Sequence, residues 1–410
     1  MLERSYIPIK EGLQRILTHT APTYQSEVIR IEDGYDRIVA KDIYAGEDLP
    51  GFDRSTVDGF AVRAEDTYGA SEMSPLYLTV VGEVFMGVPA DIEIYKGQCV
   101  KIPTGGMLPQ GADAVLMFEH AHSVGDNMIE VLKGLTLHEN VILKDEDIKK
   151  GEMVIKKGTK LKPQHIGALA GLGITEVDVF TKPTVSIIST GDEIVAPSSN
   201  IGPGQVRDIN SYTLDGLIRQ SGAKTKKYGI FSDDYPTLRS IFEQALLESD
   251  IVLISGGTSA GVKDMTARII QEAGQPGILF HGIAVKPGKP LIGAVINNKP
   301  VFGLPGHPAA IFVSFDTFIR PVIEHYLCYT DSLIRHKAVR AVMAKAVNSA
   351  SGRTDFIRVS LSEQGNRLIA TPILGKSGLI NTLVRADGIV VIDSGDLGLD
   401  AGQEVEVKLF

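Results

Sequence analysis

Cysteine and tryptophan are scarce in this chain of 410 residues, which has two cysteines, Cys99 and Cys328, and no tryptophan. Two cysteines cannot form a disulfide framework or a multi-cysteine zinc site, so both are expected to be small apolar side chains of the interior. No apolar run reaches the roughly 18 residues that a membrane-spanning helix needs. The first stretch, MLERSYIPIKEGL, carries too many charges for a secretory signal peptide. The sequence therefore predicts a cytoplasmic protein with no membrane partner.

The motifs of several enzyme classes are also missing. No G-x-x-x-x-G-K-[ST] stretch is present, which excludes a P-loop, and no H-E-x-x-H stretch marks a zinc protease. No Ser-His-Asp order and no nucleophile elbow is evident. The formal net charge of −9 argues against non-specific binding to a nucleic-acid backbone. Chemistry is therefore expected from carboxylates, hydroxyls, lysines and backbone amides.

Short apolar runs and turns divide the chain, which is long enough for about three domains, into parts of different texture. Residues 184–327 alternate strand patterns such as TVSIIS and IVLI with helical patterns, which predicts an open, mainly parallel α/β sheet. Residues 51–135 and 331–410 hold short strand-like runs between turn residues, and the second of these parts suits a small barrel or sandwich. Residues 136–180 are extended and need the N-terminal segment to bury a core. The predicted division is an elongated α+β domain from two segments (1–48 and 136–180), a β-rich domain (49–135), an α/β domain (181–330) and a C-terminal β barrel (331–410).

Four loops follow strands of the predicted α/β sheet and combine glycine or proline with hydroxyl or charged side chains. In open α/β sheets, ligands bind beyond the carboxyl ends of the strands. The spacing of the loops predicts that all four lie near one edge of the sheet. They are STGDE (189–193), SGGTSAGVKD (255–264), KPGKP (286–290) and LPGHP (304–308).

The loop SGGTSAGVKD has the composition of an anion-binding turn. Gly256 and Gly257 allow the backbone to approach a ligand with no Cβ in the way. Ser255 and Ser259 add hydroxyl donors, and successive backbone N–H groups ahead of a helix favour an anion such as phosphate. Asp264 would repel such an anion, so it is either a helix-starting acid or a group that holds a metal or a protonated part of the ligand.

Lys286 and Lys289 lie on either side of a stiff Pro-Gly turn, from which both ammonium groups can face one anion. An isolated KPGK stretch is more often two solvated lysines, but the three other loops favour the binding interpretation. His307 in LPGHP is expected to cap the helix that follows it.

Two acids outside the α/β part have contrasting surroundings. Asp58 lies in an otherwise apolar stretch, FDRSTVDGFAVR, which is unusual for an acid of the surface. Asp147 lies in the charged run DEDIKKGE, which is typical of a solvated turn. Only Asp58 therefore stands out as a functional candidate on composition.

Seven stretches together resemble the molybdopterin molybdenumtransferase family, meaning the MoeA proteins and the E domain of gephyrin. They occur in the family's order and span most of the chain: FDRSTVDGFAVR, IPTGGMLPQGADAVLMFE, DEDIKKG, STGDEI, SGGTSAGVKD, VKPGKP and GLPGHPAA. The resemblance implies four domains that agree with the division above. It also implies a reaction in which molybdate is inserted into adenylylated molybdopterin and AMP is released, with Mg²⁺ assisting.

The resemblance also assigns roles to residues of this chain. The acids that it implies for catalysis include Glu193 and Asp264, which are also the expected Mg²⁺ ligands. Some members have asparagine at the position of His307. The implied catalytic residues are Asp58, Thr104, Asp147, Glu193 and Asp264. The substrate-binding set includes the serines and glycines of SGGTSAG, which are Ser255, Gly256, Gly257 and Ser259. Its other members are one of Asp233 and Asp234, and Lys286, Lys289, Pro305, Pro308, Arg353 and Ser377.

The partners and the alternatives follow from the same resemblance. It implies a homodimer whose cleft combines the β-rich domain of one subunit with the α/β domain of the other. Further partners are a molybdopterin adenylyltransferase and apo-molybdoenzymes, and tungstate could replace molybdate. The α/β part alone would also suit a molybdopterin adenylyltransferase or a CinA-like nucleotide pyrophosphatase, and the gephyrin relatives offer a non-enzymatic scaffold as a second alternative.

Overall fold

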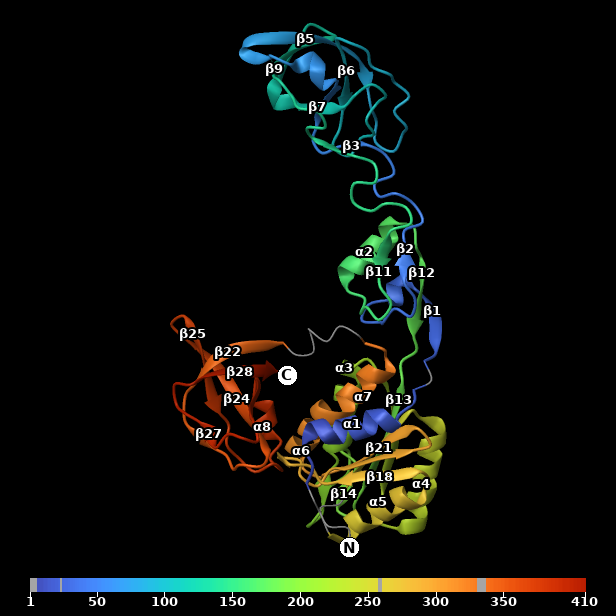
Figure 1. Cartoon of the computed structure of the whole chain (residues 1–410), viewed down its shortest axis with the longest axis vertical. Coiled ribbons are helices and arrows are strands. Elements are labelled where there is room, and N and C mark those ends of the chain that lie inside the picture. Colours follow the sequence, from blue (N-terminus) through green and yellow to red (C-terminus); the bar gives the residue numbers. More distant parts are fainter. Residues whose placement is uncertain (1–5, 23, 257–259, 330–336) are drawn as a thin grey trace.

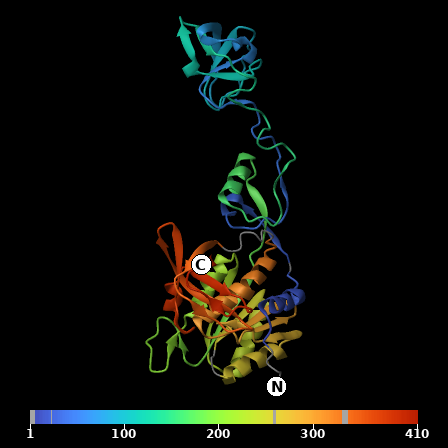
Figure 2. The same ribbon diagram turned by 60° about the vertical axis from the view of Figure 1, so that its left-hand side comes forward.

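The computed structural model is an elongated molecule whose domains follow one another along its long axis (Figure 1). It describes residues 6–22, 24–256, 260–329 and 337–410, without the side chains of residues 260–264. The β-rich domain lies at one end, the small α+β domain follows, and the α/β domain and the barrel lie at the other end, as a second view also shows (Figure 2). No helix in these described ranges is long and apolar enough to cross a membrane. The predicted multidomain fold class is confirmed.

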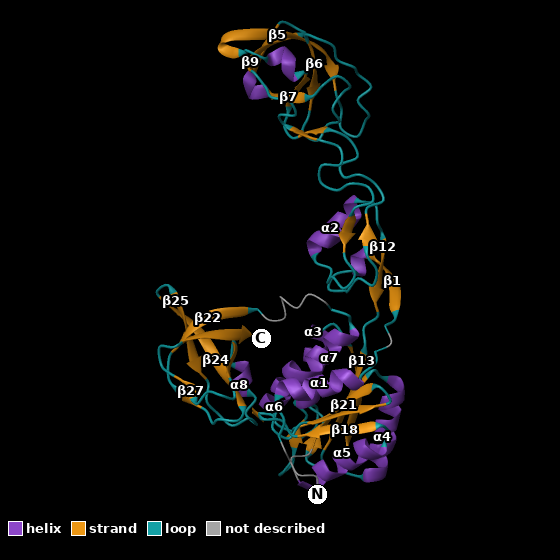
Figure 3. Ribbon diagram, in the orientation of Figure 1, coloured by secondary structure: helices purple, strands orange, loops and turns teal. Residues whose placement is uncertain are grey.

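A six-stranded sheet forms the centre of the α/β domain (Figure 3). Its strands are β13 (Thr184–Thr190), β16 (Lys224–Phe231), β17 (Ile251–Gly256), β18 (Pro276–His281), β20 (Ile292–Ile296) and β21 (Lys299–Leu304). Their order is β16-β13-β17-β21-β20-β18, and only β20 runs antiparallel to its neighbours. β17 is buried along almost its whole length, because helices cover both faces of the sheet. The predicted mainly parallel sheet is therefore confirmed.

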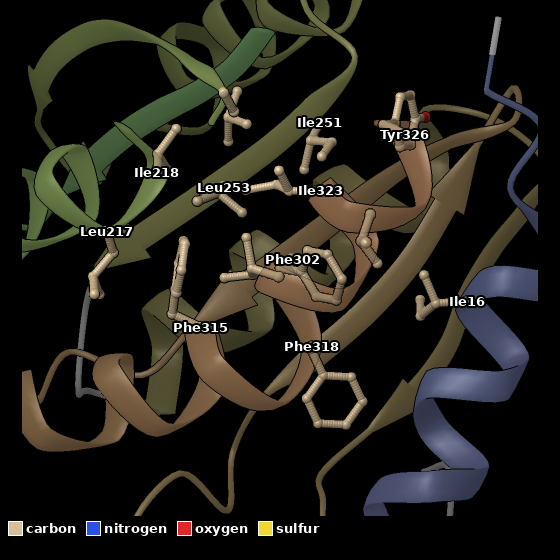
Figure 4. Packing of buried hydrophobic residues seen from close by; sticks show 14 of the residues in the cluster. Ile16, Leu217, Ile218, Ile251, Leu253, Phe302, Phe315, Phe318, Ile323 and Tyr326 are labelled. Carbon is tan, nitrogen blue, oxygen red and sulfur yellow. The ribbon is translucent and has the colours of Figure 1, made fainter. Parts of the chain in front are cut away.

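Helices cover the two faces of this sheet. They are α1 (Ile9–His19), α3 (Asn210–Gln220), α4 (Tyr235–Glu248), α5 (Ala260–Glu272), α6 (Pro308–Ser314) and α7 (Arg320–Tyr326). α4 and α5 supply the core of one face, and α1, α3, α6 and α7 supply the other. Phe302, Phe315 and Phe318 are fully buried between the sheet and the α6–α7 helix (Figure 4), and each such ring stabilises the fold by about 1.5–3 kcal/mol. α1 packs on this domain through Ile16, although the predicted division assigns residues 1–48 to the elongated domain.

Two segments of the α/β domain differ from their predicted form. The single α-helix predicted over 308–327 contains a π-helical turn (Phe315–Ile319) between α6 and α7. The predicted strand ILFHGIAV ends at His281, because the chain turns at Gly282, whose φ of +108° favours glycine. The next strand, β19 (Val285–Lys286), pairs with a strand of the C-terminal domain instead. A two-stranded parallel pair, β14 (Ile194–Val195) and β15 (Val206–Arg207), flanks the main sheet.

The C-terminal domain is a closed barrel of five strands. Its strands and its helix are β22 (Ala338–Met343), β24 (Thr354–Gln364), β25 (Arg367–Pro372), α8 (Asn381–Val384), β26 (Gly388–Ile392) and β28 (Glu404–Leu409), with a small pair formed by β23 (Val347–Asn348) and β27 (Gly398–Leu399). The order is β24-β25-β22-β28-β26, and β26 pairs again with β24, so the sheet closes and has no free edge. The structure therefore selects the barrel over the sandwich.

The two segments of the small α+β domain pair with each other, as predicted. The N-terminal segment supplies β1 (Ser26–Arg30), η1 (Ile31–Asp33) and β2 (Ile43–Tyr44), and the later segment supplies β11 (Met153–Ile155), α2 (Pro163–Gly171) and β12 (Glu176–Phe180). β1 pairs with β12 and β2 pairs with β11. Both segments contribute to one core, for example through Val39 and Leu169, so neither segment buries this core alone.

The β-rich domain is also built on a six-stranded sheet, with apolar clusters on both of its sides. Its elements are β3 (Arg54–Ser55), β4 (Gly59–Val62), η2 (Ala64–Thr67), β5 (Ser71–Glu83), β6 (Gln98–Ile102), β7 (Ala114–Met117), η3 (Phe118–His120), β8 (Ala121–Val124), β9 (Met128–Lys133) and β10 (Val141–Ile142). The strand order is β7-β4-β6-β5-β9-β8. β10 pairs with β3, so the pairing of this domain continues beyond residue 135. Cys99 is buried on β6, and burial raises the pKa of its thiol to about 12, as expected for an inert core cysteine.

Candidate active site

The carboxyl ends of β13, β17 and β21 meet at one edge of the sheet, because these strands are parallel, so three of the four predicted loops follow strands at this edge. The fourth loop, KPGKP, follows β19, which pairs with the barrel strand β24 instead. Thr190 is the last residue of β13, and its Oγ1 donates a 2.7 Å hydrogen bond to Asp233 Oδ1. The backbone N–H of Asp233 donates to Asp192 Oδ1 at 3.1 Å. Glu193 is the next residue of the same loop and is half-buried. The edge therefore carries carboxylates from two loops, and hydrogen bonds from neighbouring loop residues fix an oxygen of Asp192 and one of Asp233.

The geometry separates the two adjacent acids Asp233 and Asp234. Asp234 is the N-cap of α4, and its side chain accepts hydrogen bonds from the Thr237 backbone N–H (3.1 Å) and from Thr237 Oγ1 (2.6 Å). Both bonds lower the pKa of Asp234, and the bond from the Thr237 hydroxyl contributes most. Because the cap uses the Asp234 carboxylate, Asp233 is the better candidate for the ligand-binding acid of this pair.

At the end of β17, Ser255 and Gly256 meet β13. A Cβ built on Gly256 would lie 2.2 Å from both the carbonyl oxygen and Cγ2 of Thr190. Packing between strands therefore requires glycine here, which is a different reason from the predicted approach of a ligand. Ser255 is 1% exposed, and its Oγ has no hydrogen-bond partner in the part of the chain that the structure describes. Such an unpaired buried hydroxyl at the edge is consistent with a ligand-binding role.

Three predicted residues of the SGGTSAGVKD loop lie outside the description. Gly257 and Ser259 are among the residues that are not described, and the side chain of Asp264 is not described either. Their predicted roles stay predictions.

A cavity of about 670 Å³ lies between the α/β domain and the barrel. Among its lining residues are five cationic side chains and one carboxylate, Asp355, so the cavity favours an anion. Pro308 does not line it but begins α6, whose residue Ala310 does. The predicted site residues that line the cavity are Lys286, Lys289, Pro305, Arg353 and Ser377.

Two interactions fix the barrel side of the cavity. Arg353 donates to the buried carboxylate of Asp355 through Nε (2.8 Å) and Nη2 (3.3 Å). His307 is the N-cap residue of α6, as predicted, although its side chain makes no cap hydrogen bond. Its Nδ1 is instead 2.9 Å from Ser377 Oγ, which joins the LPGHP loop to the barrel. The loop and the GKSG segment are therefore held together at the cavity wall.

Several lining residues were missed by the sequence analysis. Lys376 stands beside Ser377 in GKSG, and this adjacency was the available signal. Arg358 belongs to a strand pattern in which a charged residue suggests only an outward face. Tyr6 lines the cavity, and the Lys289 ammonium lies 3.9 Å from the centroid of its ring. Local patterns cannot identify such residues, because they depend on packing between domains.

The predicted residues of the β-rich domain form a separate group. Asp58 Oδ1 accepts hydrogen bonds from the Thr104 backbone N–H (2.7 Å) and from Thr104 Oγ1 (3.1 Å), and both side chains are exposed. The next residue, Gly59, must be glycine, because a Cβ there would lie 1.9 Å from the Leu116 carbonyl oxygen. Asp147 is also exposed, on the connection between the β-rich and α+β domains. Both views place the β-rich domain at the opposite end of the molecule from the α/β sheet (Figures 1 and 2), so one chain does not bring these acids to the cavity.

The donor chemistry of the sheet edge suits a hard divalent cation. Glu193, Asp233 and the unpaired hydroxyl of Ser255 offer the oxygen ligands that Mg²⁺ prefers. No cluster of three metal-ligating side chains is found among the described residues, from which the Asp264 side chain is missing.

Comparisons with known proteins agree with this architecture. Family models match three consecutive parts of the chain: the MoeA N-terminal region (domain I and II) over residues 7–173, the "probable molybdopterin binding domain" over 186–325, and the MoeA C-terminal region (domain IV) over 340–410. A relative from Methanocaldococcus jannaschii is 35% identical and covers 100% of this chain and 99% of its own length. The molybdopterin molybdenumtransferase of Bacillus subtilis is 32% identical, with 100% of this chain and 96% of that protein covered. The crystal structure of the molybdopterin biosynthesis MoeA protein of Pyrococcus horikoshii is 39% identical, covers 99% of each chain and superposes with a TM-score of 0.83.

The fold and the site thus define a multidomain protein of the MoeA type. The chain belongs to the MoeA family of molybdopterin molybdenumtransferases, since full-length relatives and models for each of its parts match it from residue 7 to residue 410.

Proposed function

We propose that this protein is a molybdopterin molybdenumtransferase that inserts molybdate, or tungstate, into adenylylated molybdopterin and releases AMP. The observation that carries the proposal is the cavity of about 670 Å³ between an α/β domain of the molybdopterin-binding type and the barrel, whose charged lining residues are five cationic side chains and one carboxylate. The relatives that bear the transferase name cover the whole chain. An adenylyltransferase or a pyrophosphatase would need only the α/β domain and would leave the other three domains unused.

The residues divide into two groups with different tasks. Molybdate is a tetrahedral oxyanion, and Arg353 and Ser377 offer it charged and hydroxyl donors in the cavity. The sheet edge with Glu193 and Asp233 accepts hydrogen bonds, which suits the N–H groups of the pterin. Hydrolysis of the phosphoanhydride, in which a water molecule attacks phosphorus as the bridging P–O bond breaks, releases AMP, and Lys286 and Lys289 offset the negative charge that develops on the phosphate oxygens.

We include Mg²⁺ in the proposal because the donors of the sheet edge fit it. Glu193 and Asp264 would hold the ion, and it would offset charge on the phosphoanhydride oxygens. Replacing Glu193 with glutamine is expected to raise the Mg²⁺ concentration needed for half-maximal AMP release.

We also propose that the working unit is a homodimer with shared clefts. Asp58 and Thr104 form an exposed, hydrogen-bonded pair, and their domain lies at the opposite end of the molecule from the α/β sheet of the same chain. A second copy, by bringing its α/β domain to this pair, would complete a site that a single chain leaves divided. The adenylyltransferase that makes the substrate and the apo-enzymes that receive the product are the further partners of this proposal.

The decisive test is whether AMP release depends on molybdate. Purified protein with adenylylated molybdopterin and Mg²⁺ is expected to release AMP only when molybdate or tungstate is added. A pyrophosphatase would release AMP without the oxyanion, and a scaffold would release none under any condition.

Lys286→Ala is expected to weaken binding of adenylylated molybdopterin about tenfold or more, because a charge-assisted hydrogen bond contributes about 1.5–3 kcal/mol. Lys224→Ala is the matched control, since Lys224 is an exposed lysine of β16 outside the cavity lining. Dissociation constants from calorimetry would measure both. Equal affinities for the two variants would remove Lys286 from the site.

A further inference from the structure

The segment 206–210, which begins with β15 and ends at the first residue of α3, bonds to two loops of the candidate site. Val206 donates its backbone N–H to the Glu193 carbonyl oxygen at 2.8 Å. Asn210 donates from Nδ2 to the Gly306 carbonyl oxygen, in the LPGHP loop, at 2.9 Å. The two loops follow β13 and β21, which lie on either side of β17 in the sheet. One short segment therefore bridges both loops.

A buried carboxylate lies in the middle of this segment. Asp208 is 8% exposed, and its Oδ2 accepts a hydrogen bond from Ser189 Oγ at 3.0 Å. Its Oδ1 accepts one from the Ser211 backbone N–H, also at 3.0 Å. Ser189 is itself buried and immediately precedes Thr190, whose hydroxyl holds Asp233. Asp208 therefore connects the end of β13 to the first turn of α3.

The start of α3 explains only part of this arrangement. An acid at a helix start needs one bond to a backbone N–H of the first turn, such as that of Ser211, and it needs no burial. The bond from Ser189 comes from a different element, the end of β13. Both donors to Asp208 are neutral, whereas a buried carboxylate is usually paired with a cation because burying a charge is costly.

Asn210 also carries a cost. It is 8% exposed, and its Oδ1 is closed to solvent without a hydrogen-bond partner among the described residues. Buried polar groups that bridge several elements hold those elements in one arrangement, and departures from cheap packing concentrate at functional sites. The spacing of the two loops therefore matters more here than the stability of the turn.

We propose that Asp208 and Asn210 are positioning residues of the active site. Asp208 holds the end of β13, from which Glu193 and the partner of Asp233 extend, and Asn210 holds the LPGHP loop on the other side of β17. Neither side chain needs to touch the substrate, because each acts through the loop that it holds. This inference rests on the proposed function, since it names residues that position the same site.

Four variants test the role of Asp208 in solution. Asp208→Ala removes both bonds, whereas the amide of Asp208→Asn can accept from the Ser211 N–H and donate to Ser189 Oγ. Ser189→Ala removes only the bond to β13. Ser186→Ala is the matched control, because Ser186 is another buried serine of β13 and its hydroxyl bonds to the buried Ser249 outside the site loops. Thermal unfolding verifies the fold of each variant.

Asp208→Ala and Ser189→Ala are expected to lower kcat/KM for molybdate-dependent AMP release about 100-fold, the loss that a displacement of about 1 Å can cause. Asp208→Asn and Ser186→Ala are expected to stay close to the wild type. An Asp208→Asn protein as inactive as Asp208→Ala would overturn the proposal, because the charge of Asp208 would then act by itself. Equal losses in Ser186→Ala and Ser189→Ala would also overturn it, since any buried serine of the strand would then have the same effect. If Asp208→Ala does not fold, Ser189→Ala decides the comparison.

Crystal structures of Ser189→Ala and Asn210→Ala give a measurement that does not depend on activity. The Ser189 variant is expected to displace Glu193, and the Asn210 variant is expected to displace Gly306, each by about 1 Å relative to the wild type. Loops that stay in place in both variants would overturn the proposal. If the wild type releases no AMP with molybdate, the proposed function fails, and these displacements decide by themselves whether the segment sets the spacing of the loops.

Discussion

Mixed dimers of an Asp58→Asn chain and an Asp264→Asn chain are expected to regain activity that neither variant has alone. Asp58 lies in the β-rich domain, Asp264 lies on α5, and the two domains are at opposite ends of one chain (Figure 1). If each cleft combines the β-rich domain of one subunit with the α/β domain of its partner, one cleft of the mixed dimer carries both substitutions. The other cleft carries neither and should turn over normally.

The measurement is molybdate-dependent AMP release by mixed dimers purified through two different affinity tags. The controls are the two single-variant dimers, which should be inactive because both of their clefts carry a substitution. Purified mixed dimers that stay inactive would rule out the shared cleft, because each subunit would then hold a complete but damaged site of its own.

Gly256→Ala is expected to destabilise the α/β domain and to abolish activity. The new Cβ would lie 2.2 Å from the carbonyl oxygen and Cγ2 of Thr190, so β13 and β17 must move apart where they pair. Overpacking of this kind costs about 1–3 kcal/mol, and contact with backbone leaves little room for relief. Thr190 also holds Asp233 through a 2.7 Å hydrogen bond, so the same shift would displace a candidate ligand-binding acid.

Gly216→Ala serves as the control in the same domain. Gly216 is exposed on α3, and a Cβ there would meet nothing within 4 Å. Alanine is expected to stabilise this helix by up to about 1 kcal/mol. Denaturant unfolding and AMP release measure both variants, and equal stability of the two would show that the strands tolerate the methyl group.

The Asp58–Thr104 pair illustrates how far sequence patterns reach. The stretches FDRSTVDGFAVR and IPTGG marked both residues, and the structure joins them through two hydrogen bonds. Local sequence patterns do not predict that this pair lies far from the α/β sheet of its own chain. That separation arises because the α+β domain lies between the β-rich domain and the α/β domain. Asp233 and Asp234 illustrate the same limit at short range, since only the helix start at α4 distinguishes the cap from the candidate ligand.

The sequence by itself determined the local elements, because they depend on the period of apolar residues and on nearby turn residues. Buried runs such as IVLI predict parallel strands, and the composition of the loops at their ends predicts anion binding. Two segments that are too small to fold alone predict one shared domain. Only the tertiary structure decided that β19 leaves the α/β sheet to pair with β24, and that His307 contacts Ser377. It also decided that Arg358 lies at the cavity between two domains and donates from Nη2 to the Gly375 carbonyl oxygen. These contacts join residues far apart in the chain, and they are set by the packing of one domain on another, to which short-range periodicity carries no signal.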